Sequence, residues 1–183
     1  MKILITAIIL FCLVGCGPTY GESYIVHIHP SFNLKTEEVL AAMEKWNNAV
    51  GISLTSIVEE PVHCDDPGNI CIYIANESLL VEKTGPNPDG TWTGVTTRNT
   101  RDYATIYILD TILLDYPDPK IESDTLNALE ETIPHELGHA FGLQHDPHMG
   151  TVMCANTGCG STQISCWDKQ QYYKLRGVDY YCP

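Results

Sequence analysis

Positive charge is scarce in this sequence. Its 183 residues include 10 lysines and arginines against 23 aspartates and glutamates, which gives a formal net charge of −13 at pH 7. Such an acidic chain repels the phosphates of nucleic acids and has no electrostatic attraction to anionic lipid surfaces. We therefore expect no nucleic-acid partner, and any attachment to a membrane should come from a lipid anchor.

The N-terminal region lacks a hydrophobic run of membrane-spanning length. The apolar stretch 3–14 follows the basic start Met1-Lys2, and it is much shorter than the about 20 residues that a spanning helix needs. A basic start followed by a short apolar segment is typical of an export signal. Its end, Leu13-Val14-Gly15-Cys16, resembles the bacterial lipobox, in which the cysteine is acylated and becomes the mature N-terminus. The alternative is an ordinary signal peptidase site near Gly17.

Both readings of this segment predict an exported protein. The lipobox reading gives a lipoprotein on the outer surface or in the periplasm, with a lipid on Cys16 as its membrane attachment. The other reading gives a secreted extracellular protein. We expect an export signal at 1–15, a short tether at 16–23 and one domain at 24–183.

Free thiols are not expected in the mature chain. Outside the export signal and its processing site there are six cysteines: Cys64, Cys71, Cys154, Cys159, Cys166 and Cys182. An even number in an exported protein indicates three disulfides. Cys64 and Cys71 lie on either side of a turn-rich Asp-Asp-Pro-Gly-Asn segment, so a bridge between them is the favoured pairing.

The chain carries both strand and helix patterns and no internal repeat. Short β-branched stretches predict strands at 24–29, 52–58, 70–75 and 104–109, with a weaker one at 91–97. Apolar residues at helical spacing predict one helix that is capped by Thr36 and stopped by Gly51. A second runs from a capping Asp124 to about Leu143, with Pro134 expected to kink or restart it. Ser165 and Asp168 form a pair of the capping-box type that predicts a third helix.

The segment 135–145, His-Glu-Leu-Gly-His-Ala-Phe-Gly-Leu-Gln-His, carries the chemistry. His135 and His139 are four residues apart, so both project from one face of a helix. Gly142 can adopt a left-handed conformation that ends the helix and brings His145 back toward them. Three neutral imidazoles can hold a tetrahedral zinc ion and leave one position for a water molecule, whose pKa falls toward about 7. Glu136, next to the first ligand, can take the proton of that water as general base.

This extended motif resembles that of the metzincin clan of zinc endopeptidases. Met153, in Thr151-Val152-Met153-Cys154, fits the methionine turn that the family has beneath its metal. The resemblance implies an α+β fold: a twisted mixed sheet with two long helices above the zinc, and a small irregular lower subdomain with a C-terminal helix. Asp146 resembles the adamalysin group, whereas the short domain and the wording around His139 are closer to matrixins, so the subfamily stays open.

The family also implies how a substrate would bind. Its exposed edge strand pairs antiparallel with the extended substrate, and 91–97 is the candidate for this strand. The alternative is that this strand is an inert boundary of the sheet.

The sequence therefore predicts a monomeric, exported, zinc-dependent endopeptidase that acts on extracellular proteins or peptides. The first alternative is a zinc-binding surface lipoprotein, an adhesion or binding module without peptidase activity. Glu136 argues against it, because a purely structural zinc site has no use for a base beside an open coordination position. The second alternative, zinc hydrolysis of a non-peptide bond, is disfavoured only by the family resemblance.

Other polar residues permit weaker readings. His27 and His29 share one strand face but have no third ligand at a suggestive spacing, and His148 could contact substrate. Calcium could bind at the acidic turns 65–66, 87–89 and 115–118. None of these turns has the regular ligand spacing of a calcium loop, so we expect them to be solvated.

Overall fold

The computed structural model describes residues 22–32, 35–60, 64–85, 93–98, 103–112, 119–155 and 160–182. The predicted export signal, most of the tether with Cys16, the acidic turns 87–89 and 115–118, and Cys159 lie outside the described residues. The predictions made for them are not addressed by the structure.

Five strands form one mixed sheet in the order β2-β1-β3-β5-β4. Four of them are parallel: β1 (Ser23–Ile28), β2 (Ser53–Val58), β3 (Asn69–Ala75) and β5 (Ala104–Leu109). β4 (Gly94–Arg98) pairs antiparallel with β5 and forms the edge of the sheet. The four stronger strand predictions are correct to within one residue at each end. The weaker prediction is also confirmed as an edge strand, although residues 91 and 92 lie outside the described part.

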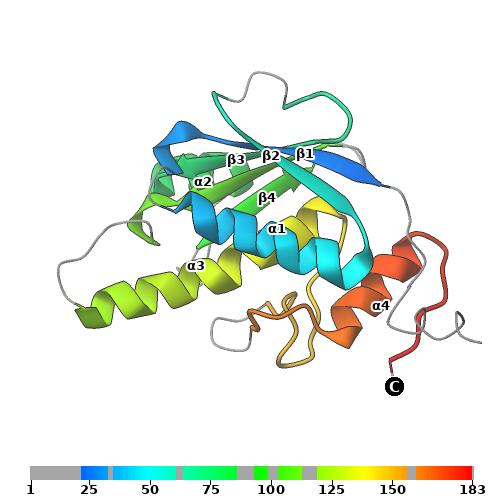
Figure 1. Ribbon diagram of the computed structural model, residues 1–183. Coiled ribbons are helices and arrows are strands. Elements are labelled where there is room, and N and C mark those ends of the chain that lie inside the picture. Colours follow the sequence, from blue (N-terminus) through cyan, green and yellow to red (C-terminus); the bar gives the residue numbers. More distant parts are fainter. Residues whose placement is uncertain are drawn as a thin grey trace, which may run out of the picture.

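Two helices cover one face of this sheet. α1 (Thr36–Val50) and α3 (Pro119–Ala140) lie side by side beneath it, and α4 (Cys166–Leu175) lies farther from the sheet, beside the end of α1 (Figure 1). The main core fills the space between sheet and helices, with fully buried Trp46, Ile106 and Leu137 among its members. This layering gives an α+β architecture, as expected, and the described residues form four α-helices where the sequence predicted three.

The helix ends differ in detail from the sequence predictions. Gly51 ends α1 in the left-handed region at φ 71° as predicted, but Lys35 occupies the N-cap position and makes no side-chain capping bond. Thr36 is already helical, and its hydroxyl donates back to the Phe32 carbonyl at 3.3 Å. The Ser165–Asp168 capping box at the start of α4 is confirmed.

α3 begins earlier than predicted and is continuous through Pro134. It begins at Pro119, so Asp124 lies inside it and is not its cap, and it continues through Pro134 to Ala140 without a break. Pro134 is buried, and its carbonyl accepts a hydrogen bond from Trp46 Nε1 at 2.9 Å. Packing of α3 against α1 therefore keeps the helix intact where local propensity disfavours it.

One helix was not predicted. α2 (Glu77–Thr84) begins where the Asn76 side chain accepts a hydrogen bond from the Leu79 amide, and it buries Leu80 in a small second cluster with Ala75 and Val95. One buried leucine gives too weak an apolar stripe for recognition from sequence.

Disulfides connect parts of this fold. Cys64–Cys71 is confirmed as the local bridge, and Cys166 bonds to Cys182. Cys154 is disulfide-bonded as well. Among the described residues, no helix is both long enough and apolar enough to cross a membrane.

Candidate metal centre

Three histidines meet at the C-terminal end of α3. His135 and His139 lie on its last turns, and His145 lies on the segment that follows. Nitrogen atoms of the three rings all lie within 4.8 Å of one another, and this is the metal-competent group found within the described ranges. His139 Nε2 and His145 Nε2 are 3.1 Å apart, close to the about 3.3 Å that two imidazole ligands of a tetrahedral zinc ion keep.

Backbone carbonyls orient two of the three rings. His135 Nδ1 donates to the Val152 carbonyl at 2.7 Å, and His139 Nδ1 donates to the Leu143 carbonyl at 2.9 Å. A neutral imidazole that donates through Nδ1 carries its lone pair on Nε2. Both rings are therefore held in the tautomer that a metal requires, so the residues fit a zinc ion.

Burial keeps these imidazoles neutral. It lowers the pKa of His139 to about 4, with further lowering from the neighbouring His135 and His145. The pKa of His135 is also lowered, mainly by burial, although its bond to Val152 acts in the opposite direction. A neutral imidazole is the form that binds a metal.

Gly142 makes the turn that brings in the third histidine. Its φ of 97° lies in the left-handed region, where a side chain would be strained. The Leu143 amide donates to the Gly138 carbonyl at 3.0 Å, and the Gly142 amide donates to the His139 carbonyl at 2.9 Å. This pair of bonds ends the helix as a Schellman motif, which confirms the predicted function of Gly142.

A buried methionine turn lies directly against the helix. Met153 is fully buried, and a Cβ built on Gly138 would lie 2.3 Å from its sulfur. Glycine at 138 therefore permits the close contact between α3 and this turn. The main chain of Asp146 donates to the Met153 carbonyl at 2.8 Å, which connects the turn to the residue after His145.

Asp168, on α4, holds the same turn from the other side. Its fully buried carboxylate accepts from the amides of Val152 and Met153 at 3.0 and 3.2 Å, and from Ser165 at 2.8 Å. Sequence analysis identified Asp168 only as part of a cap, because its contact with residues 16 positions away depends on the tertiary fold.

Glu136, the residue after His135, is buried, with 5% of its surface exposed. Burial raises its pKa to about 7, although a hydrogen bond from the Thr96 hydroxyl acts in the lowering direction. That bond joins Thr96 Oγ1 to Glu136 Oε2 at 2.6 Å. Nothing in the sequence predicted this contact, because it depends on how β4 packs against α3.

His148, His27 and His29 do not belong to the three-histidine group. His148 stacks on Trp167 with ring centroids 4.7 Å apart, and its Nδ1 contacts the Asp146 carboxylate. His27 is buried with its Nδ1 3.2 Å from Glu59, while His29 contacts Ser31 and Glu60. The structure therefore does not place His27 and His29 in a shared metal site within the described ranges.

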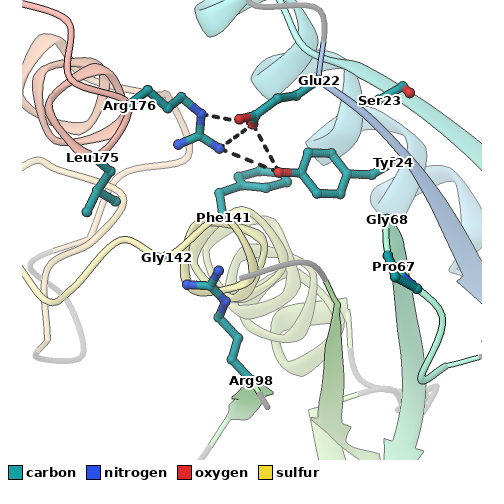
Figure 2. Close-up of a pocket in the computed structure, with 10 residues that line it drawn as sticks. All are labelled: Glu22, Ser23, Tyr24, Pro67, Gly68, Arg98, Phe141, Gly142, Leu175 and Arg176. Atoms are coloured by element: carbon teal, nitrogen blue, oxygen red, sulfur yellow. Dashed lines mark hydrogen bonds and ion pairs between the residues drawn. The ribbon is translucent and has the colours of Figure 1, made fainter. Parts of the chain in front are cut away.

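A cavity elsewhere in the described chain is not lined by the three histidines or Glu136. It has a volume of about 460 Å³ and lies where Glu22, Arg98, Gly142 and Arg176 converge (Figure 2). Arg176 Nε donates to Glu22 at 2.8 Å, so the start of β1 is tied to the end of α4. We regard the cavity as a structural junction, because Glu22, Tyr24 and Arg176 in its lining are bound to one another.

Comparison with known proteins agrees with this architecture at the level of the fold. No protein-family model matches the chain, and no curated protein matches it. The crystal structure of archaemetzincin from Methanopyrus kandleri is similar with a TM-score of 0.54 and 15% identity, covering 87% of this chain and 98% of that one. A zinc-dependent peptidase from Methanocorpusculum labreanum gives a TM-score of 0.49 and 12% identity, covering 81% and 99%. At these identities the likeness to the first structure shows a shared fold.

Proposed function

We propose that this protein is a zinc-dependent endopeptidase of the metzincin type. The observation that carries the proposal is the set of three converging histidines with a buried carboxyl, Glu136, immediately beside the first of them. A structural zinc site would use all of its coordination positions for protein ligands. Three histidines and a neighbouring base are what a hydrolytic site needs.

His135, His139 and His145 would hold the metal through their ring nitrogens. When bound, zinc supplies a Lewis acid that polarises a substrate carbonyl and makes water a nucleophile at neutral pH. Glu136 would accept the proton of the attacking water and return it to the leaving amine. In the metal-free protein burial raises the pKa of Glu136 to about 7, and a positioned carboxyl of this kind can take up and return a proton.

β4 is suited to bind an extended peptide. It forms an edge of the sheet and packs against α3, the helix that bears Glu136. The free edge of a strand offers unpaired main-chain groups to a peptide that adds as a further antiparallel strand. The substrate class that fits is therefore an extended polypeptide segment.

The test is cleavage of a peptide library by the zinc-loaded protein, analysed by mass spectrometry. We expect cleavage that stops in the presence of a chelator and returns with added zinc. Glu136→Gln should retain zinc and fold while losing turnover by about 10²- to 10⁴-fold, the usual contribution of a positioned proton-transfer group.

A matched control is Glu131→Gln, which removes a carboxyl of the same helix at a partly exposed position. It should cleave like the parent. Stable zinc binding without cleavage of any peptide would contradict the proposal and favour the zinc-binding surface module instead. Turnover that survives Glu136→Gln would contradict the assignment of the base.

A further inference from the structure

Thr96 is the polar side chain of the edge strand that reaches the general base. Its hydroxyl lies 2.6 Å from Glu136 Oε2 and 3.0 Å from the main-chain carbonyl of the same residue. An ionised carboxylate only accepts hydrogen bonds, so the hydroxyl donates to it. This bond holds Oε2 of the Glu136 carboxylate in place.

Gly94 allows β4 to come this close to α3. It lies two residues before Thr96, so it faces the same side of the strand. A Cβ built on Gly94 would lie 2.8 Å from Thr132 Cγ2, 3.0 Å from Glu136 Cγ and 3.1 Å from Glu136 Oε1. Any larger residue would push the strand away from the helix. The contact of Thr96 with Glu136 is thus supported by a second position of the same strand.

The main chain of Thr96 faces the open edge of the sheet. The Leu109 amide donates to the Thr93 carbonyl at 3.0 Å, and Gly94 lies opposite Ile108. In an antiparallel pair, hydrogen-bonded and non-hydrogen-bonded pairs alternate along the strand. The main-chain groups of Val95 and Thr97 therefore point toward β5, whereas those of Thr96 point outward. Thr96 therefore directs its main-chain groups toward the position of a bound peptide and its side chain toward Glu136.

We infer that Thr96 is a positioning residue whose hydroxyl fixes the Glu136 carboxylate for proton transfer, on the strand that pairs with the substrate. The inference rests on the proposed function of Glu136. Main-chain pairing with a peptide would stiffen the same strand that holds the base. Removal of the hydroxyl leaves the main chain unchanged, so it should affect turnover and not the binding of peptide.

The experiment compares three variants in the purified, zinc-loaded protein. Thr96→Val removes the hydroxyl with little change in shape, and Thr96→Ser retains it. Thr97→Val is the matched control, because its hydroxyl donates at 3.4 Å to the Thr105 carbonyl and does not contact Glu136. We expect Thr96→Val to lower kcat by about 10- to 100-fold, as misplacement of a catalytic group does, with KM and zinc content unchanged. Thr96→Ser and Thr97→Val should both stay close to the parent.

A second measurement does not depend on cleavage. The carboxyl carbon of Glu136 can be followed by nuclear magnetic resonance in ¹³C-glutamate-labelled protein, since zinc is diamagnetic, and assigned by its absence in Glu136→Gln. Thr96→Val should shift this resonance, and Thr97→Val should leave it in place. An unshifted resonance overturns the inference whatever the activity, and so does an unchanged kcat in Thr96→Val when the parent is active. A parent that cleaves no peptide, with the shift present, overturns the proposed function of Glu136 while the contact stands.

Discussion

At the scale of single residues, the proton positions of the three histidines decide what the centre can bind. Two of the rings donate through Nδ1 to main-chain carbonyls, of Val152 and Leu143, so their Nε2 atoms carry lone pairs. Burial lowers the pKa of both rings, most strongly for His139. His135 and His139 are therefore already in the neutral tautomer that a metal requires. Their lowered pKa values mean that both rings resist protonation.

Acid should consequently destabilise the metal-free protein through His139. Its pKa of about 4 in the folded chain lies below the value of 6.5 expected without the fold. The unfolded chain therefore takes up a proton first as the pH falls. The stabilising contribution is fully present above about pH 6.5 and is lost progressively between about pH 6.5 and 4.

Urea denaturation of the chelator-treated protein across this range measures the effect. The free energy of unfolding of the parent should fall more steeply with decreasing pH than that of His139→Asn, in which the titrating ring is absent. Equal slopes for the two proteins would show that His139 is not held neutral by the fold.

At the scale of elements, α4 supports the three-histidine group although it contributes no histidine to it. Asp168 accepts hydrogen bonds from the amides of Val152 and Met153, and the carbonyl of Val152 accepts from His135 Nδ1. The chain of bonds thus runs from α4 through the methionine turn to a residue of α3. Partners that orient a metal ligand in this way influence metal affinity.

Asp168→Asn should weaken zinc binding without removing a ligand. One carboxylate oxygen becomes an amide that cannot accept from a main-chain N–H, so a buried donor loses its partner. We expect zinc affinity to fall by about 10- to 100-fold and the free energy of unfolding to fall by about 1–3 kcal/mol.

Competition with a chromophoric chelator gives the affinity. Asp179→Asn is the matched control, because Asp179 is exposed and follows the same helix. The control should bind zinc like the parent. Equal affinity of Asp168→Asn and the parent would show that α4 does not orient the centre.

The elements also show what sequence could and could not predict. Strand periodicity located β1, β2, β3 and β5 well, because buried strands carry runs of β-branched residues. The predicted start of α3 was five residues too late. Whether the helix continues through Pro134 could not be predicted, because it depends on packing against Trp46. α2 escaped prediction since it buries only Leu80 among its described residues.

At the scale of the whole molecule, the three-histidine centre combines a local sequence motif with contacts from residues that are distant in the sequence. The residues from His135 to His145 lie within one stretch of chain, so their spacing alone predicted that they would converge. Thr96 and Asp168 come from β4 and α4, and no local pattern connects them with Glu136 or His135. Register between a strand and a helix is a property of the complete fold, which explains why these contacts appear only in the structure.

Contacts that involve none of the three histidines join the start of β1 to α4. The Arg176 guanidinium binds Glu22 and lies 3.6 Å from the centre of the Tyr172 ring, and Cys166–Cys182 closes the C-terminal segment onto α4. Burial alone would raise the pKa of Glu22, but the bond and charge of Arg176 outweigh it and lower the pKa. The sheet and α4 are therefore connected by contacts that do not require zinc, so we expect the metal-free protein to be folded.

The central claim is that three histidines hold zinc and leave one position for water. X-ray absorption spectroscopy of the zinc-loaded protein tests it most directly, because it reports the ligands around the ion. The account predicts three imidazole nitrogens and one further light atom at about 2.0–2.1 Å, and no sulfur at about 2.3 Å. His145→Ala should show one imidazole fewer. A sulfur ligand, or a fourth protein ligand in place of water, would contradict the account.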